Sequence, residues 1–418
     1  MSPMSADQRM PREFSPFVTV CLAMVVGVMG TALISPLYAL YKEAWNLQPS
    51  DVSLIYVIYM VGALTGLLFL GRLPDRIGFV RVMGISLVLG LIGTFISMMA
   101  WNTTSLIVGR VVVGVSSTMM TTGATLGLST LSRAGSLQRT AMVTGFLMAL
   151  GFGLGPLMGG IFGEWLPWPL VTTYIPSLLL CVWGLHSLYR LRLPAHVRPP
   201  AAAAQPMGWH DFVPHLTLPA PDQYRVFAIT CALPFVAFAV FGVYASMAPL
   251  FLEKLVPWHG PFMSGISLAM ILLVSACVQI LAGSWPTYLT GMGGAMALVI
   301  SNALLIANFY SSSALLFGAG VLCTAAGHGM CMLAGMSMIN RIAQPGKRSG
   351  LLATYLVVGY LGSIAPMMAM GWMADHWGLR ASVTVFACMI IAVGSGVATA
   401  FRIYPGMRQG DDGLPAPR

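Results

Sequence analysis

The sequence predicts an all-α integral membrane protein in which twelve transmembrane helices form two pseudo-symmetric six-helix bundles. Three observations predict this fold class: the apolar composition, the length of the apolar runs and an internal repeat. Of the 418 residues, 57% are hydrophobic and only 8% are charged, whereas a soluble domain carries about 25% charged residues. Because unpaired backbone groups are costly in hydrocarbon, the spans must be helices or a closed barrel, and runs of about 20 apolar residues indicate helices.

The apolar runs define the individual spans. The segments between them are rich in polar residues, glycine or proline, which end a helix or allow a turn. We place the twelve spans near residues 17–41, 51–71, 81–100, 104–131, 140–163, 169–190, 226–251, 260–283, 291–310, 313–340, 350–374 and 381–403.

The positions of the basic residues predict the orientation. Of the 21 Lys and Arg residues, only Lys42, Lys254 and Arg380 fall in one set of alternate loops, and Arg110 falls inside a span. All the others lie in the termini or in the opposite set of loops. Basic loops stay in the cytoplasm, so both termini are expected there, in a multi-pass protein of the bacterial inner membrane. The net charge of +9 therefore reflects orientation in a lipid bilayer, and we expect no nucleic-acid partner.

A proline-rich segment divides the spans six and six. Proline at this density prevents a spanning helix, so residues 191–224 are expected to be a cytoplasmic linker between a first bundle, residues 1–190, and a second bundle, residues 225–418. The two bundles can be aligned at an offset of about 210 residues. The matched positions are Ser35–Tyr38 with Ala248–Phe251, Trp45 with Trp258, Gly71 with Gly283, Pro74 with Pro286, Gly78 with Gly291, and Pro156 with Pro366.

The loop after the second span carries a first motif. It contains Gly71, Asp75, Arg76, Gly78 and Arg81 in the order GRLPDRIGFVR, which resembles the loop G-x-L-x-D-R-x-G-x-x-R of the major facilitator superfamily. The resemblance implies a cytoplasmic gate in which the acid docks against the start of the eleventh span, near Ser349 and Gly350, while the outside is open. The usual basic pair after the second glycine is replaced here by Phe79 and Val80. An ordinary set of positively charged membrane anchors is the alternative.

Arg110 lies inside the fourth span, in the run LIVGRVVVG, which resembles the family pattern L-x-x-x-R-x-x-x-G. A guanidinium in a span costs at least about 2.5–3.5 kcal/mol, so it must face protein or water and is a functional candidate. The resemblance implies a part in proton transfer. A structural pairing with backbone carbonyls and a contact with lipid headgroups are the alternatives.

The fifth span carries a glycine-rich motif, which resembles the G-x-x-x-G-P-x-x-G-G motif of proton-driven antiporters in the superfamily. Small residues four apart let a neighbouring helix approach closely, and proline bends the span. The resemblance favours export over import, and generic close packing is the alternative. The motif residues are Gly151, Gly155, Pro156, Gly159 and Gly160.

The resemblance also implies that spans one, four, seven and ten line a central cavity. These spans supply aromatic and hydroxyl side chains with little charge, which suits a moderately apolar or aromatic solute. None of the twelve acids lies in the middle of a predicted span, so proton coupling could use Arg110, His328 or the span-end acids Glu43 and Asp51. Uniport and substrate exchange stay open. The predicted cavity residues are Ser35, Tyr38, Ser117, Phe238, Tyr244 and Thr324.

Together these patterns predict a secondary active transporter that exports a small drug or metabolite by alternating access, with proton antiport, as a monomer. An uptake permease of the same fold, for a siderophore or an aromatic nutrient, is the alternative. The chain lacks a clustered catalytic or metal-ligating set and a nucleotide-binding loop, so we expect no enzyme activity, no metal and no cofactor.

Overall fold

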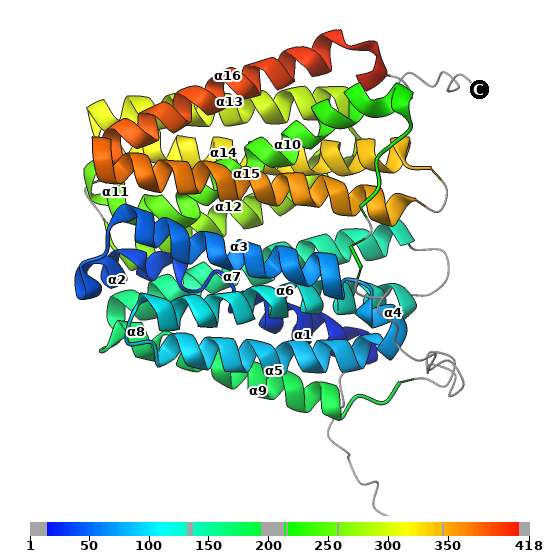
Figure 1. Ribbon diagram of the computed structural model, residues 1–418, viewed down its shortest axis with the longest axis vertical. Coiled ribbons are helices and arrows are strands. Elements are labelled where there is room, and N and C mark those ends of the chain that lie inside the picture. The colour runs from blue at the N-terminus through cyan, green and yellow to red at the C-terminus, as the bar shows by residue number, and fades with distance from the viewer. Residues whose placement is uncertain are drawn as a thin grey trace, which may run out of the picture.

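Every regular element in the described part of the chain is a helix (Figure 1). The computed structural model describes residues 15–131, 137–193, 213–214, 216–256, 259–344 and 347–408, without the side chains of 137–142, 253–255 and 349. Most of the predicted linker, residues 194–212 and 215, lies outside this range. Within it, eleven helical stretches are long and apolar enough to cross a membrane, and a shorter apolar helix precedes them. The predicted all-helical membrane fold is confirmed.

The first bundle contains ten helical elements. They are α1 (Pro16–Met29), the 3-10 turn η1 (Ser35–Leu37), α2 (Tyr38–Trp45), α3 (Pro49–Leu70), α4 (Leu73–Ile77), α5 (Phe79–Met98), α6 (Thr103–Leu131), α7 (Leu137–Trp165), α8 (Pro169–Thr172) and α9 (Ile175–Tyr189).

The second bundle repeats this order. Its elements are η4 (Pro221–Gln223), α10 (Tyr224–Gly242), the π-helical turn η5 (Val243–Met247), α11 (Ala248–Leu255), α12 (Pro261–Leu281), η6 (Ala282–Ser284), α13 (Thr287–Ser311), α14 (Ala314–Ile342), α15 (Arg348–Trp377), α16 (Leu379–Ile403) and η7 (Pro405–Met407).

The first predicted span is broken where the sequence suggested one continuous run. The α-helix ends at Met29, an irregular stretch follows, and the chain re-enters helical structure through η1, with Pro36 at its second position. Pro36 lacks a backbone N–H and so removes one hydrogen bond of a regular helix at this point, which favours the break. The corresponding stretch of the second bundle is also irregular, since η5 precedes Pro249 of α11.

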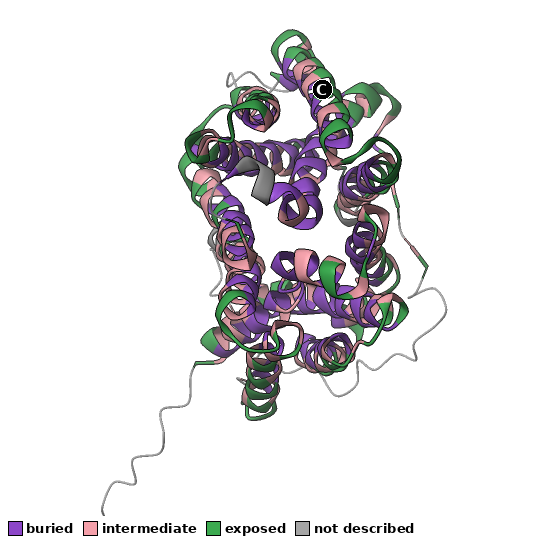
Figure 2. Ribbon diagram, turned by 90° about the vertical axis from the view of Figure 1, so that its left-hand side faces the viewer, coloured by how far each residue is buried: buried purple, intermediate pink, exposed green. Residues whose placement is uncertain are grey.

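The two bundles meet along two long seams. In one seam α3 packs against α15, and in the other α7 packs against α12. We call the end of the molecule that carries α4 the α4 face, and the end that carries α2, α8 and α11 the α8 face (Figure 1). At the α8 face, η1 and α2 also contact η5 and α11, so the bundles are closed against each other there. Figure 2, viewed from the α8 face, shows that buried residues cluster where the bundles face each other and exposed residues lie at the periphery.

Helix α7 carries the glycine-rich motif and uses it on two sides. Towards α1, a Cβ on Gly151 would lie 2.9 Å from the Val25 carbonyl oxygen, and Gly155 and Gly159 meet the carbonyls of Met29 and Leu33 still more closely. Towards α12, a Cβ on Gly160 would lie 2.7 Å from the Pro261 carbonyl oxygen, and Pro156 touches Gly265 through its own carbonyl. The motif therefore packs α7 tightly between its own bundle and the other one.

We expect Gly159→Ala to destabilise the protein by about 1–3 kcal/mol, the usual cost of overpacking. The added Cβ would lie 3.0 Å from the Leu33 carbonyl carbon, and backbone atoms cannot move away as a side chain can. Thermal unfolding of the purified protein in detergent measures the change. Gly145→Ala on the same helix is the matched control, because a Cβ there meets nothing within 4 Å. Equal unfolding temperatures for the two variants would contradict the close packing.

Candidate functional site

Arg110 of α6 is buried and bonded to the break in the first span. Its side chain is 3% exposed, and Nη1 donates a 2.7 Å hydrogen bond to the backbone oxygen of Thr31. Its guanidinium carbon also lies 4.7 Å from the centre of the Tyr59 ring. Since the carbonyl end of a helix is negative, a cation stabilises it. Arg110 therefore satisfies backbone that the interrupted α1 leaves without an intrahelical partner.

Hydroxyl groups surround this guanidinium. The Tyr59 hydroxyl lies 3.5 Å from Oγ of Ser117, a long contact. The Tyr38 hydroxyl and Nε of Arg110 are both buried with no hydrogen-bond partner in the described residues. A buried polar group without a partner costs about 1–3 kcal/mol, so these atoms are suited to bind a polar group of a ligand.

The second bundle supplies an aromatic cluster around His328 of α14. The imidazole is stacked with Phe238, at a distance of 6.1 Å between ring centres and an angle of 19°, and it also contacts Phe241 at 5.9 Å. Its Nδ1 is 2.9 Å from Oγ of Ser275 on α12. On its other side, Phe238 meets the edge of Tyr360 at 5.9 Å. The cluster offers flat apolar faces with a few hydrogen-bonding groups among them.

The two groups of side chains face each other across the seam between α3 and α15. The Tyr56 hydroxyl and Oγ of Ser363 form a 3.0 Å hydrogen bond between the bundles. One turn further towards the α4 face, Tyr59 lies on the same side of α3 as Tyr56, and Tyr360 lies on the same side of α15 as Ser363. The Arg110 group and the His328 cluster therefore border one region in the middle of the molecule.

The structure places only part of the predicted cavity set in this region. Tyr38 and Ser117 lie beside Arg110 or Tyr59, and Phe238 lies beside His328. Tyr244 instead packs against Phe317, at 6.4 Å, nearer the α8 face. The hydroxyl of Thr324 is buried with no partner among the described residues. Ser35 lies in η1, which packs against α7 and α12.

The hydroxyl residues on either side of Ser117 in α6 point elsewhere. Ser116 exchanges hydrogen bonds with Ser86 of α5, its Oγ lying 2.8 Å from the Ser86 backbone oxygen. Thr118 lies against Gly66 of α3. Of the three consecutive residues on α6, only Ser117 is therefore directed towards the Arg110 group.

The predicted gate residues gather on the α4 face. Gly78 has a φ of +88°, a conformation that favours glycine, whereas Gly71 has ordinary helical backbone angles. Asp75, Arg76 and Arg81 are exposed. The Asp75 carboxylate makes no hydrogen bond to α15 within the described residues, and its role as a gate stays a prediction.

Spans two, eight and eleven supply residues that the sequence analysis missed. A usable signal was present in α3, where tyrosines recur three residues apart in an otherwise apolar run, because a buried phenol usually needs a hydrogen-bond partner. The missed residues are Tyr56, Tyr59, Ser275, Tyr360 and Ser363.

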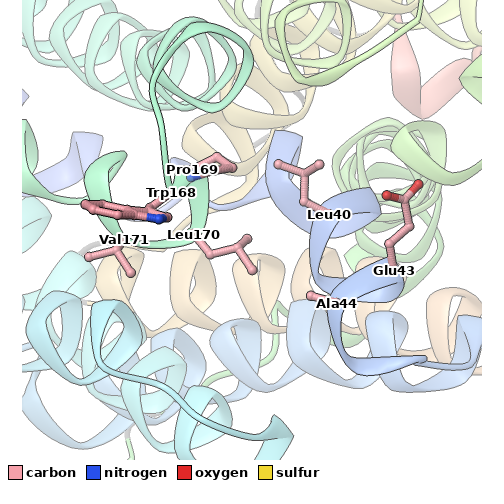
Figure 3. A pocket seen from close by; sticks show the side chains of 7 residues that line it. All are labelled: Leu40, Glu43, Ala44, Trp168, Pro169, Leu170 and Val171. Carbon is pink, nitrogen blue, oxygen red and sulfur yellow. The ribbon is translucent and has the colours of Figure 1, made fainter.

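An open depression of about 590 Å³ lies on the α8 face, away from the central region (Figure 3). Its lining is apolar apart from Glu43 of α2, which stands opposite Trp168, the residue before α8, in the close-up. Trp168 is largely exposed, as expected of an aromatic side chain at a membrane interface. The lining residues are Leu40, Glu43, Ala44, Trp168, Pro169, Leu170 and Val171.

Two helical bundles with a polar and aromatic region between them define a polytopic membrane transporter, not an enzyme. A sequence profile described as the Major Facilitator Superfamily matches residues 20–332. The chain belongs to the Major Facilitator Superfamily. The predicted membership of the superfamily is thereby confirmed, and the assignment to its drug/proton antiporter branch stays a prediction.

Among curated proteins, the chain is similar to the riboflavin transporter RibZ of Clostridioides difficile (strain 630), with 24% identity over 164 residues. That similarity covers 39% of this chain and 36% of the relative, so the match spans about a third of the relative's length.

Solved structures share the fold over nearly the whole chain. A bacterial homologue of the human lysosomal transporter Spinster, in an inward-facing and occupied conformation, has a TM-score of 0.71 at 16% identity, covering 96% of this chain and 98% of that one. A D-xylose–proton symporter has a TM-score of 0.71 at 15% identity, covering 94% and 98%. A mutant form of the nucleoside transporter NupG has a TM-score of 0.68 at 12% identity, covering 93% and 99%.

We expect Arg110→Ala to destabilise the protein by about 1.5–3 kcal/mol, the usual worth of a hydrogen bond to a charged group. The substitution leaves the buried Thr31 carbonyl without its donor. Thermal unfolding in detergent provides the measurement. Arg380→Ala is the matched control, because Arg380 is exposed and only stacks on Tyr310, at 4.4 Å, a contact worth about 0.5–1 kcal/mol at exposed sites. A loss no larger for Arg110→Ala than for the control would contradict the capping role.

Proposed function

We propose that this member of the superfamily is a secondary active transporter that exports a small, moderately hydrophobic or aromatic molecule by alternating access, with proton antiport. The observation that carries the proposal is the pairing of two unlike surfaces at the centre of the molecule. One surface is the aromatic cluster of Phe238, His328 and Tyr360, and the other is the Arg110 group with its unpaired polar atoms. A flat apolar molecule with a polar edge complements both surfaces.

Two of the similar proteins are named for substrates of this class. Riboflavin and nucleosides each join a flat heteroaromatic ring system to a hydroxylated group, an open chain in riboflavin and a sugar ring in nucleosides. The Arg110 group supplies hydrogen-bond donors for polar edges, and the ring cluster supplies stacking faces. A dicarboxylate or a sugar phosphate would need several bases, and Arg110 is the one Lys or Arg side chain that is buried among the described residues.

Export and proton coupling rest on the fifth-span motif and on His328. The motif holds α7 tightly against α1 and α12, and the antiporter assignment comes from its resemblance to the family motif. The acids of the described spans lie at helix ends, so His328, bonded to Ser275, is the titratable group proposed to exchange a proton in the central region.

We also propose that the α4 face lies in the cytoplasm. The loop residues Arg72, Arg76 and Arg81, together with Arg341, Lys347 and Arg348, are all on that side, which the positive-inside rule assigns to the cytoplasm. Both termini then lie in the cytoplasm of a monomer in the bacterial inner membrane.

A substrate screen in everted membrane vesicles tests the function. The vesicles contain the protein, a pH gradient is imposed with the interior acidic, and riboflavin, a purine nucleoside, an aromatic drug cation and D-xylose are supplied outside. We expect accumulation of an aromatic compound, lost when the gradient is dissipated, and no accumulation of D-xylose. Accumulation only in right-side-out vesicles would establish the uptake alternative, and gradient-independent equilibration would establish uniport.

We expect Phe238→Ala to weaken the apparent affinity for the accumulated aromatic compound by about three- to tenfold, because one stacking face is lost. Concentration dependence of uptake into the same vesicles measures it. Phe95→Ala is the control, since Phe95 of α5 is 53% exposed on the outer surface of its bundle. Unchanged affinity in Phe238→Ala would remove the ring cluster from the substrate site.

We expect Asp75→Asn to slow transport by about two- to fivefold, the effect of losing one carboxylate that faces a helix N-terminus. The initial rate at saturating substrate provides the measurement. Asp222→Asn removes the same charge from an exposed residue that bonds only to its neighbour Gln223 among described residues, and should transport normally. Equal rates for the two variants and the unsubstituted protein would argue against the gate.

A further inference from the structure

Each seam between the bundles ends, on the α8 face, with a carboxylate of one bundle at the start of a helix of the other. Glu164, in the last turn of α7, accepts a 3.3 Å hydrogen bond from the backbone N–H of Phe262 at the start of α12. Asp375, in the last turn of α15, accepts a 3.2 Å hydrogen bond from the backbone N–H of Ser50 at the start of α3. Both bonds cross between the bundles, in opposite directions.

Both carboxylates meet the same position of the receiving helix. Helices α3 and α12 each begin with a proline, Pro49 and Pro261, which has no N–H. The next residue therefore carries the first free donor of the helix, and an acceptor is needed for it. In α12 the preceding residue is Gly260, which has no side chain to act as a cap, and Glu164 occupies that place: a Cβ on Gly260 would lie 2.5 Å from its Oε2.

The sequence repeats this arrangement in the two halves. Glu164 follows Gly160 by four residues, and Asp375 follows Gly371 by four residues. Both glycines allow the close approach that brings the acid within reach. A Cβ on Gly160 would lie 2.7 Å from the Pro261 carbonyl oxygen, and one on Gly371 would lie 3.0 Å from the Ser50 Cα. A helix ending in G-x-x-x-acid thus meets a helix beginning with proline at both seams.

We infer that Glu164 and Asp375 are a symmetric pair of positioning residues that hold the α8 face closed in the transport cycle. The inference rests on the proposed alternating access, but not on the substrate, the direction or the coupling ion. Parting of the bundles at this face removes the acceptor from two helix N-termini at once, so the closed arrangement is favoured by both caps together. The loop acid Asp75, predicted to face a helix N-terminus on the α4 face, would use the same chemistry when the other end closes.

The test measures the separation of the bundles directly. Spin labels on Thr104→Cys of α6 and Ala314→Cys of α14 place one probe in each bundle at the α8 face, in the full-length chain with its seven native cysteines replaced. Double electron–electron resonance in lipid nanodiscs gives the ratio of long to short distances. We expect Glu164→Ala and Asp375→Ala each to raise this ratio about fivefold, the usual effect of one lost helix cap, and the double variant to raise it roughly twentyfold.

Asp51→Ala is the matched control, because Asp51 caps the same end of α3 from within its own bundle. Its Oδ2 accepts a 2.9 Å hydrogen bond from the Gln48 backbone N–H, and its loss should leave the distances unchanged. Asp375→Glu keeps a carboxylate and should stay close to the unsubstituted ratio. An unchanged ratio in the double variant overturns the inference, and so does a shift in Asp51→Ala as large as that in Asp375→Ala.

These results separate the inference from the proposed function. A protein that transports none of the aromatic probes can still shift its distances when both caps are removed, and this outcome would support the closing role alone. A protein that exports an aromatic compound but shows no shift in the double variant would keep the transport function and lose the role of Glu164 and Asp375.

Discussion

The structure depends on the need to satisfy every backbone amide and carbonyl without water in the middle of a membrane. A continuous α-helix meets this need locally, and most spans are continuous. The first span is not, and its Thr31 carbonyl is satisfied by a guanidinium from another helix, α6. A break in a span is tolerable only where protein covers it. Arg110 and the irregular stretch after α1 therefore depend on each other.

The same requirement shapes the interface between the bundles. In helices that cross the whole membrane, the backbone groups without an intrahelical partner lie at the helix ends. The other polar groups at the interface belong to the few side chains that point inward. Small residues bring α7 within contact of α12 and α15 within contact of α3. With the backbones this close, one hydrogen bond between Tyr56 and Ser363 joins the bundles at mid-depth. The aromatic side chains Phe238, Phe241 and Tyr360 gather with His328 in the central region.

The all-helical membrane fold could be predicted from the sequence, because apolar composition and the length of an apolar run are properties of each span by itself. Pro36 marks the break in the first span, but the partner of the Thr31 carbonyl could not be predicted, since it is a guanidinium 79 residues away in the chain. The direction of the hydroxyls on α6 was equally hidden: Ser116 and Ser117 are adjacent, yet one bonds to α5 and the other faces Tyr59. The rotation of a helix about its axis is set by the helices packed against it. An almost uniformly apolar run has no periodic pattern that would reveal this rotation.

The sequence predicted only part of the proposed central site, because the rest depends on how the helices pack. Phe238 and His328 lie on spans expected to face inward, and the structure stacks them. Tyr59 and Tyr360 lie on spans two and eleven, which were not among the spans expected to line the cavity. They reach the centre because α3 and α15 form a seam. The end-of-span acids Glu164 and Asp375 were visible as charges, but the backbone donors that they bind lie in the other bundle.

The buried guanidinium has a further consequence for recognition. Arg110 has five N–H donors, and its Nε has no partner among the described residues. Transferring a guanidinium out of water costs free energy. In this molecule the hydrogen bond to Thr31 and the contact with the ring of Tyr59 offset that cost in the folded state. A ligand that presents an acceptor to Nε finds a donor that is fixed, dehydrated and oriented in advance. For the proposed substrate, selectivity would then come from this preorganisation, because an acceptor placed one bond differently on the same ring would gain little from it.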